Sequence, residues 1–261
     1  MFAGKRGRQW TMLARWLVPA MMLLAYVFMA ATAETDTSGQ AWMGLGFVFV
    51  MVLWWIFRLT TSSAALARAV GVGDADRMLE IVRRELPGRT RGRAKLLAAR
   101  AFAYEVRGAW ADTLTSADEA RAAADAELVG PLLGTYRAKL AAARVAALVE
   151  TKRVGEARAA YDAELAPADI AHGGALVQRQ RIELAGVVHL AAGRVALAEG
   201  DAAAAMAELQ RVLDDVRAGA FQRAGAHYYA ARICDARGDS AGAASHRTEV
   251  GQLAPASWLA R

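Results

Sequence analysis

The chain has 261 residues, and 56% of them are apolar, a larger share than an ordinary soluble domain carries. Five prolines and few β-branched residues after position 60 favour a helical protein, and the single cysteine, Cys234, excludes an intramolecular disulfide framework and fits a reducing compartment. The formal net charge of +6 comes mainly from basic residues on either side of the apolar N-terminal region.

Two uncharged runs in the first sixty residues predict a transmembrane hairpin. They cover residues 16–33 and 41–57, each roughly 25 Å long at about 1.5 Å per residue, with an acidic loop between them. Basic residues precede the first run and follow the second, so the positive-inside rule places both termini in the cytoplasm. We expect a bacterial inner-membrane protein with a basic segment at 1–15, spans at 16–33 and 41–58, an external loop at 34–40 and a cytoplasmic domain at 59–261.

Two alternatives to this hairpin stay open. Residues 1–33 also resemble a cleaved signal peptide, with a basic start, an apolar stretch and small residues before Glu34. A cleaved chain would start outside and cross inward through residues 41–57, so the domain after residue 60 would still lie in the cytoplasm. A buried soluble hairpin is the other alternative. It is disfavoured because two uncharged runs are hard to cover in a chain of this size.

After residue 60 one local pattern recurs: a helical run, a glycine with a small or polar successor, and another helical run. Glycine enters the left-handed conformation that commonly ends a helix, and an acidic residue after it can accept from the free amides of the next helix. The separations of 35 to 47 residues suit antiparallel helical hairpins. The predicted turns are at Gly73, Gly108, Gly155, Gly200 and Gly238.

The best copies of this pattern resemble the tetratricopeptide repeat. In "VHLAAGRVALAEGDAAAAMAELQRVL" Gly193 and Ala205 occupy the family's small-residue positions on either side of the turn, and "HYYAARICDARGDSAGAASHRTEVGQLAP" is similar. The resemblance implies an all-α protein with an α-solenoid of about five hairpins, whose concave face binds peptides or helices of other proteins. The layout of two N-terminal spans followed by repeats is similar to that of HemY-type inner-membrane proteins, although the outer loop here is much smaller.

The resemblance also indicates which side chains face the groove. At the matching first-helix positions stand Phe102, Leu190, Arg194, Tyr228 and Arg232. The last four would form a patch for an acidic or C-terminal carboxylate ligand. The Lys and Asn pair of the carboxylate-clamp repeats is missing, and two merely solvent-exposed arginines are the alternative interpretation.

A basic segment follows the second predicted span. Each Lys or Arg near an anionic leaflet contributes about 1 kcal/mol, so we expect this segment to contact lipid headgroups, with a merely solvated turn as the alternative. Nucleic-acid binding is not expected, because no aromatic residues are interleaved with the charges. The residues concerned are Arg83, Arg84, Arg89, Arg91, Arg93 and Lys95.

No residue pattern in the sequence indicates catalysis, a metal or a cofactor. The four histidines lack metal-ligand spacing, and His189, His227 and Cys234 fall at packing positions of the repeat. The expected function is therefore a membrane-anchored scaffold or adaptor that binds partner proteins. The alternative is an assembly factor or accessory subunit of a membrane complex, in which Gly44 and Gly46 permit close contact between spans. An unrecognised enzyme or a nucleic-acid binder is a less favoured alternative.

Overall fold

The computed structural model describes residues 64–166 and 175–260, and they contain helices and turns without any strand. The expectation of an all-α protein is confirmed for this part of the chain. The predicted segments up to residue 58 lie outside the described residues. Within the described ranges no helix combines the length and apolar character needed to cross a membrane.

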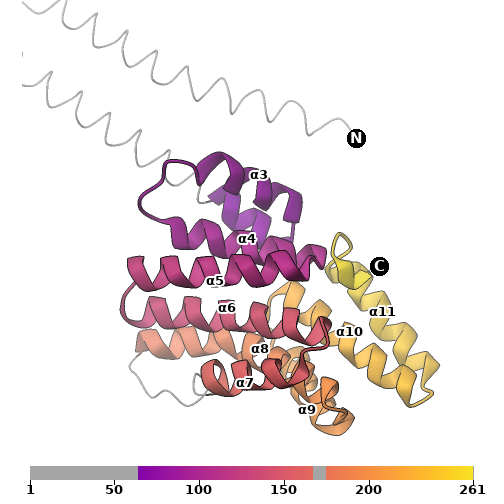
Figure 1. Ribbon diagram of the computed structural model, residues 1–261. Helices are drawn as coiled ribbons and strands as arrows, with labels where there is room; N and C mark the ends of the chain where they lie inside the picture. The colour runs from indigo at the N-terminus through magenta and orange to yellow at the C-terminus, as the bar shows by residue number, and fades with distance from the viewer. Residues whose placement is uncertain (1–63, 167–174, 261) are drawn as a thin grey trace, which may run out of the picture. The chain divides into compact units, whose positions relative to one another are not determined.

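The chain divides into two compact units, residues 1–65 and 66–261, and the described helices with assigned bounds belong to the second. Figure 1 shows these helices as rods that follow one another in antiparallel pairs. After a short helical stretch at residues 66–71 they are α3 (Ala75–Glu85), α4 (Arg93–Arg107), α5 (Trp110–Glu127), α6 (Gly130–Glu150), α7 (Val154–Glu164), α8 (Ala175–Ala198), α9 (Ala202–Asp214), α10 (Ala220–Ala236), α11 (Ser240–Leu253) and the 3₁₀ turn η2 (Trp258–Ala260).

The pairs are helical hairpins, and their first helices lie next to one another. Helix α4 pairs with α5, α6 with α7, α8 with α9, and α10 with α11. Helix α6 also packs against α4 and α8, and α8 packs against α10. This arrangement is repeat-like and compatible with an α-solenoid.

Four of the five predicted glycine turns are confirmed. Gly73, Gly108, Gly200 and Gly238 have φ angles of 65°, 73°, 89° and 77°, in the left-handed region that other residues enter only with strain. Each of these glycines lies between two helices of the repeating pattern. Glycine at these positions therefore ends the first helix and lets the chain reverse.

An aspartate after three of these glycines begins the next helix. Asp74, Asp201 and Asp239 are N-cap residues, and their carboxylates accept backbone N–H groups three residues later at 2.9, 2.9 and 2.8 Å. Each bond satisfies one of the amides that a helix start leaves without a partner. The expected helix-starting role of an acid after the glycine is confirmed at these three turns.

The predicted turn at Gly155 is wrong by three residues. Helix α7 begins at Val154, so Gly155 is its second residue, and Lys152 takes the left-handed conformation instead, with a φ of 65°. The spacing rule failed because this turn has no glycine at its left-handed position. With the turn at Lys152, the fully buried Ala157 falls five residues after it, where the pattern requires a small side chain.

Small residues bring the two helices of a hairpin close together. At Gly193 in α8 a β-carbon would lie 2.9 Å from Cδ2 of Leu209 in α9, so Leu209 would have to shift to accept any side chain at that position. Ala205 and Leu209 are fully buried on the facing helix. The expected close-packing role of Gly193 and Ala205 is confirmed, because the absence of a side chain at Gly193 makes room for Leu209.

We predict opposite effects for the same substitution at two of the predicted turns. Gly155→Ala should stabilise the protein by roughly 0.5 kcal/mol, since the residue is helical and nothing lies within 4 Å of the added carbon. Gly200→Ala should destabilise it by about 1–2 kcal/mol, because φ is 89° there. Urea unfolding of the two variants checks this, and a gain at Gly200 would contradict the assigned turn.

Candidate functional site

The first helices of successive hairpins enclose a cavity of about 380 Å³. Residues 66–70 and helices α4, α6, α8 and α10 all contribute to its lining, which is mostly apolar. Its volume falls within the range of about 300–1,000 Å³ that is common for small-molecule sites. The concave side of the hairpin stack therefore contains a pocket of ligand size.

The stack closes on itself around this cavity. In an open solenoid each hairpin contacts only its neighbours. Here Phe102 of α4 meets Phe221 of α10 edge to face with ring centroids 5.1 Å apart, and Trp110 of α5 meets Trp258 of η2 at 4.9 Å. A β-carbon at Gly108 would lie 3.1 Å from Trp258, so that glycine also makes room for the closing contact. These contacts bound the concave side of the described stack, which forms a partly open pocket.

A buried ion pair lies at the floor of the cavity. Arg194 of α8 is only 2% exposed, and its Nη1 donates to Oε1 of Glu105 in α4 at 3.1 Å. Its guanidinium also lies over the ring of Tyr229, 5.4 Å from the centroid. The Nε and Nη2 atoms of Arg194 are buried and have no acceptor among the described residues. The arginine therefore joins three helices while part of its hydrogen-bonding capacity is unused.

Burial dominates the ionisation of the groups around Arg194. It raises the pKa of Glu105, while the charge and the hydrogen bond of Arg194 oppose this rise. Burial also raises the pKa of Tyr229, whose neutral hydroxyl donates to Oε1 of Glu150 at 2.7 Å. Arg232 reaches the same Glu150 oxygen at 4.0 Å. Glu105 and Glu150, each in the first helix of a hairpin, thus accept hydrogen bonds from residues of later hairpins.

The five residues predicted to line one groove do not line a single space, and Tyr228 lines neither of the two described next. Phe102, Leu190 and Arg194 line the cavity, whereas Tyr228 and Arg232 do not. Arg232 lines a smaller space of about 70 Å³, which Arg194 also borders. The alternative interpretation of a solvent-exposed arginine does not hold for Arg194, because its side chain is buried and paired with Glu105. The expected binding of a carboxylate ligand stays a prediction.

The sequence analysis missed Glu105, the acid that pairs with Arg194, and Lys139, one of the two lysines at the rim. Glu105 is 7% exposed, and its signal was a single acid inside the apolar stretch "AFAYEV". Lys95 and Lys139 are exposed lining residues, and neither has an ion-pair partner among the described residues. The lining thus carries three cations, Lys95, Lys139 and Arg194, against one acid. This balance favours an anionic ligand.

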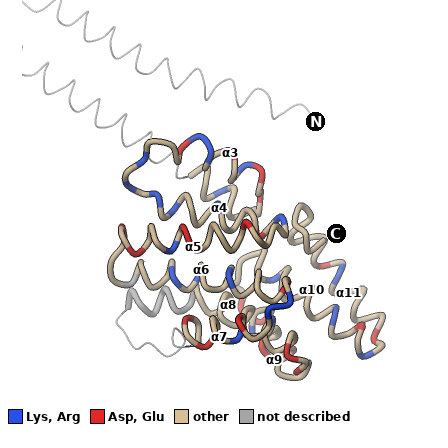
Figure 2. Tube along the Cα trace, viewed as in Figure 1, with Lys and Arg blue, Asp and Glu red and all other residues tan. Residues whose placement is uncertain are grey.

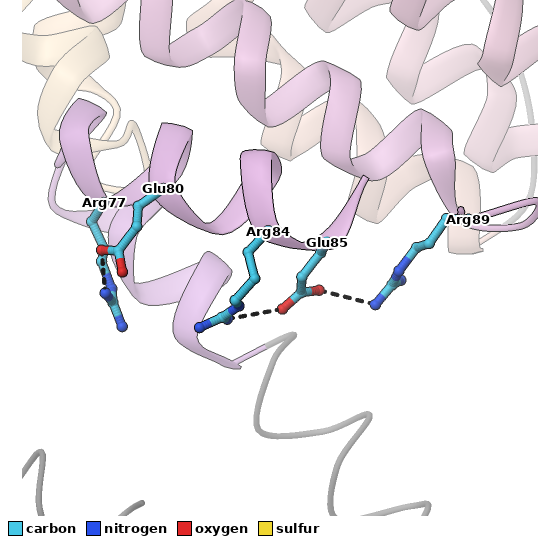
Figure 3. A network of polar contacts seen from close by, with 5 residues as sticks. All are labelled: Arg77, Glu80, Arg84, Glu85 and Arg89. Atoms are coloured by element: carbon cyan, nitrogen blue, oxygen red, sulfur yellow. Dashed lines mark hydrogen bonds and ion pairs between the residues drawn. The ribbon is translucent and has the colours of Figure 1, made fainter. Parts of the chain in front are cut away.

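The predicted headgroup cluster is also divided by the structure. Figure 2 shows Lys and Arg along the connection between α3 and α4. Arg83, Arg89 and Arg93 line a hollow of about 720 Å³ there, whereas Lys95 lines the apolar cavity. Arg84 and Arg89 share Glu85, at 3.2 and 2.9 Å, as Figure 3 shows. The hollow also has Arg100 and Arg107 in its lining, which the sequence analysis did not single out.

The two histidines expected to serve as packing residues also make polar pairs. His189 Nδ1 lies 2.7 Å from Glu208 Oε2, and His227 Nδ1 lies 2.8 Å from His246 Nδ1. In both hairpins the first residue stands eleven positions before the turn glycine and its partner eight after it. Cys234 is buried, as expected. Among the described residues no group of three or more metal-ligating side chains comes together.

We predict that the buried ion pair is required as a pair. Glu105→Leu should destabilise the protein by about 3–5 kcal/mol because it leaves Arg194 as an uncompensated buried charge. The double variant Glu105→Leu with Arg194→Met should recover most of that loss. Urea unfolding of both variants measures the difference. As a control, Arg153→Ala breaks an exposed ion pair with Glu156 and should leave stability nearly unchanged. A double variant as unstable as the single one would contradict the prediction.

We predict that acid weakens the hairpin α10/α11 through His227. Burial, and secondly the charge of His246, lower the pKa of His227, so the folded state binds its proton less readily than the unfolded chain does. The stabilisation by neutral His227 is complete above the unfolded pKa of about 6.5 and is lost as the pH falls through the lower folded pKa. Unfolding free energies at pH 7.5 and 5.5 should show this loss, and His246→Gln should reduce it. An equal loss in the variant would contradict the role of the pair.

Comparison with known proteins gives no relative for this arrangement. No family model matches the chain, and the searches of curated proteins and of solved structures found no match either.

Proposed function

We propose that the chain is a membrane-anchored, tetratricopeptide-like scaffold that binds partner proteins on the concave side of its hairpin stack. The observation that carries this proposal is the apolar cavity with a basic rim, to which the first helices of successive hairpins contribute. Such a surface needs no catalytic group, because binding itself is the function. The spans at 16–33 and 41–58 would hold the hairpins at the inner face of a bacterial membrane.

Apolar side chains at the mouth of the cavity support a protein partner. Val70 is 37% exposed, and Phe102, Val187 and Phe221 are partly exposed around the same opening. A partner that covers the opening would remove this apolar surface from water. Lys139 at the rim favours acidic residues in such a partner.

The basic hollow between α3 and α4 supports contact with anionic lipids. The side chains of Arg83, Arg91 and Arg93 have no ion-pair partner among the described residues, although the backbone N–H of Arg93 donates to Glu127. The segment follows the second predicted span closely in the sequence, and each such cation contributes about 1 kcal/mol near an anionic surface. We propose that this contact orients the hairpin stack at the membrane.

A photocrosslinking amino acid placed in the full-length chain in living cells tests the scaffold proposal. Substitution of Val70 or Lys139 at the mouth should yield a discrete protein adduct, whereas Ala207 on the exposed side of α9 should not. Substitution of Arg91 should yield lipid adducts of low mass. Identical protein adducts from Val70 and Ala207, or none from either mouth position, would overturn the proposed site.

The same experiment addresses the alternative of an assembly factor that contacts subunits through its spans. In that case the photocrosslinker at Gly44 or Gly46 would give the protein adduct, and the mouth of the cavity would give none.

A further inference from the structure

An unsatisfied guanidinium marks the floor of the cavity. Arginine carries five N–H donors in a rigid fork, and only the Nη1 side of Arg194 has a hydrogen-bond acceptor. Its Nε and Nη2 are shielded from water and have no acceptor among the described residues. Buried polar groups are usually satisfied, so this buried edge of the guanidinium calls for an acceptor that the described chain does not supply.

The space beside this guanidinium suits an apolar molecule. Leu66, Phe102, Leu140 and Leu190 form walls of the 380 Å³ cavity that Arg194 lines. The other space that Arg194 borders measures only about 70 Å³. An acceptor that arrives through the larger cavity must therefore be attached to an apolar body, since only apolar groups fit these walls without loss of hydration.

The charge of the cavity lining further restricts the kind of ligand that can bind. Glu105 neutralises one positive charge at the floor, and Lys95 and Lys139 leave the lining with an excess of two. A carboxylate matches the fork of an arginine in geometry and compensates this excess, whereas an ammonium group would oppose it. An alcohol could accept a hydrogen bond but would leave the charge excess unchanged.

We infer that the cavity binds a small amphipathic carboxylic acid, with its apolar body between α4, α6 and α8 and its carboxylate directed toward the guanidinium of Arg194. This site goes beyond the proposed scaffold function and requires no protein partner. A peptide chain is less suitable as the occupant, because its backbone amides would enter the apolar lining without partners.

Calorimetric titration of the full-length chain in nanodiscs of neutral phospholipid tests the inference, with empty nanodiscs as the blank. Octanoate should bind at least about tenfold more tightly than octanol, and octylamine should not bind. Equal affinities for octanoate and octanol, or no binding of octanoate, would overturn the inference. A short peptide ending in leucine that binds more tightly than octanoate would overturn the assignment to a small acid.

Two variants and a matched control locate the site. Arg194→Lys keeps the charge but loses the fork, so the octanoate affinity should fall about tenfold while the octanol affinity remains. Arg232→Lys makes the same change outside the cavity lining and should alter neither affinity. Ala98→Phe fills the cavity and keeps the ion pair, so it should abolish binding even if Arg194→Lys fails to fold. Undiminished octanoate binding by Ala98→Phe would place the site elsewhere.

The result of the octanoate titration is independent of the scaffold proposal. Protein adducts from the cavity mouth without octanoate binding would leave the scaffold standing and remove the acid site. Octanoate binding without adducts would support the acid site and remove the scaffold proposal.

Discussion

The ion pair between Arg194 and Glu105 closes the hairpin stack. It joins α8 to α4 across the concave side, between hairpins that are not consecutive in the chain. Both groups lose their hydration when buried, so their mutual attraction largely offsets a desolvation penalty instead of adding stability. The pair is therefore better understood as a device that specifies one closed arrangement, in which a mismatched stack would leave a charge buried alone.

Closure changes what the concave side can do. Aromatic contacts between α4 and α10, and between α5 and η2, complete the enclosure that the ion pair begins. A surface that would lie open in an extended solenoid becomes a cavity with an apolar wall, a charged floor and a basic rim. Binding at the mouth and binding at the floor can then have different partners, since one surface is exposed and the other is buried.

Small residues make this compact arrangement possible. The fully buried Ala205 and Ala157, with Gly193 between helices, allow close approach within hairpins without large side chains. Alanine also favours the helical conformation at each of its positions. Arginines then connect the helices by ion pairs and by contact with tyrosine rings. These polar contacts help to determine which helices pack together, because small alanine side chains interlock only weakly.

The sequence by itself determined the helical class, four of the five turns and the caps that follow three of them, because glycine φ preferences and aspartate capping act within a few residues. Gly155 was misassigned because Lys152 adopts the left-handed conformation without a glycine signal. Only the tertiary structure decided that Arg194 meets Glu105, 89 residues away, and that Lys95 faces the cavity. Those placements depend on how far the stack curls, which is the sum of many packing contacts and has no local sequence pattern.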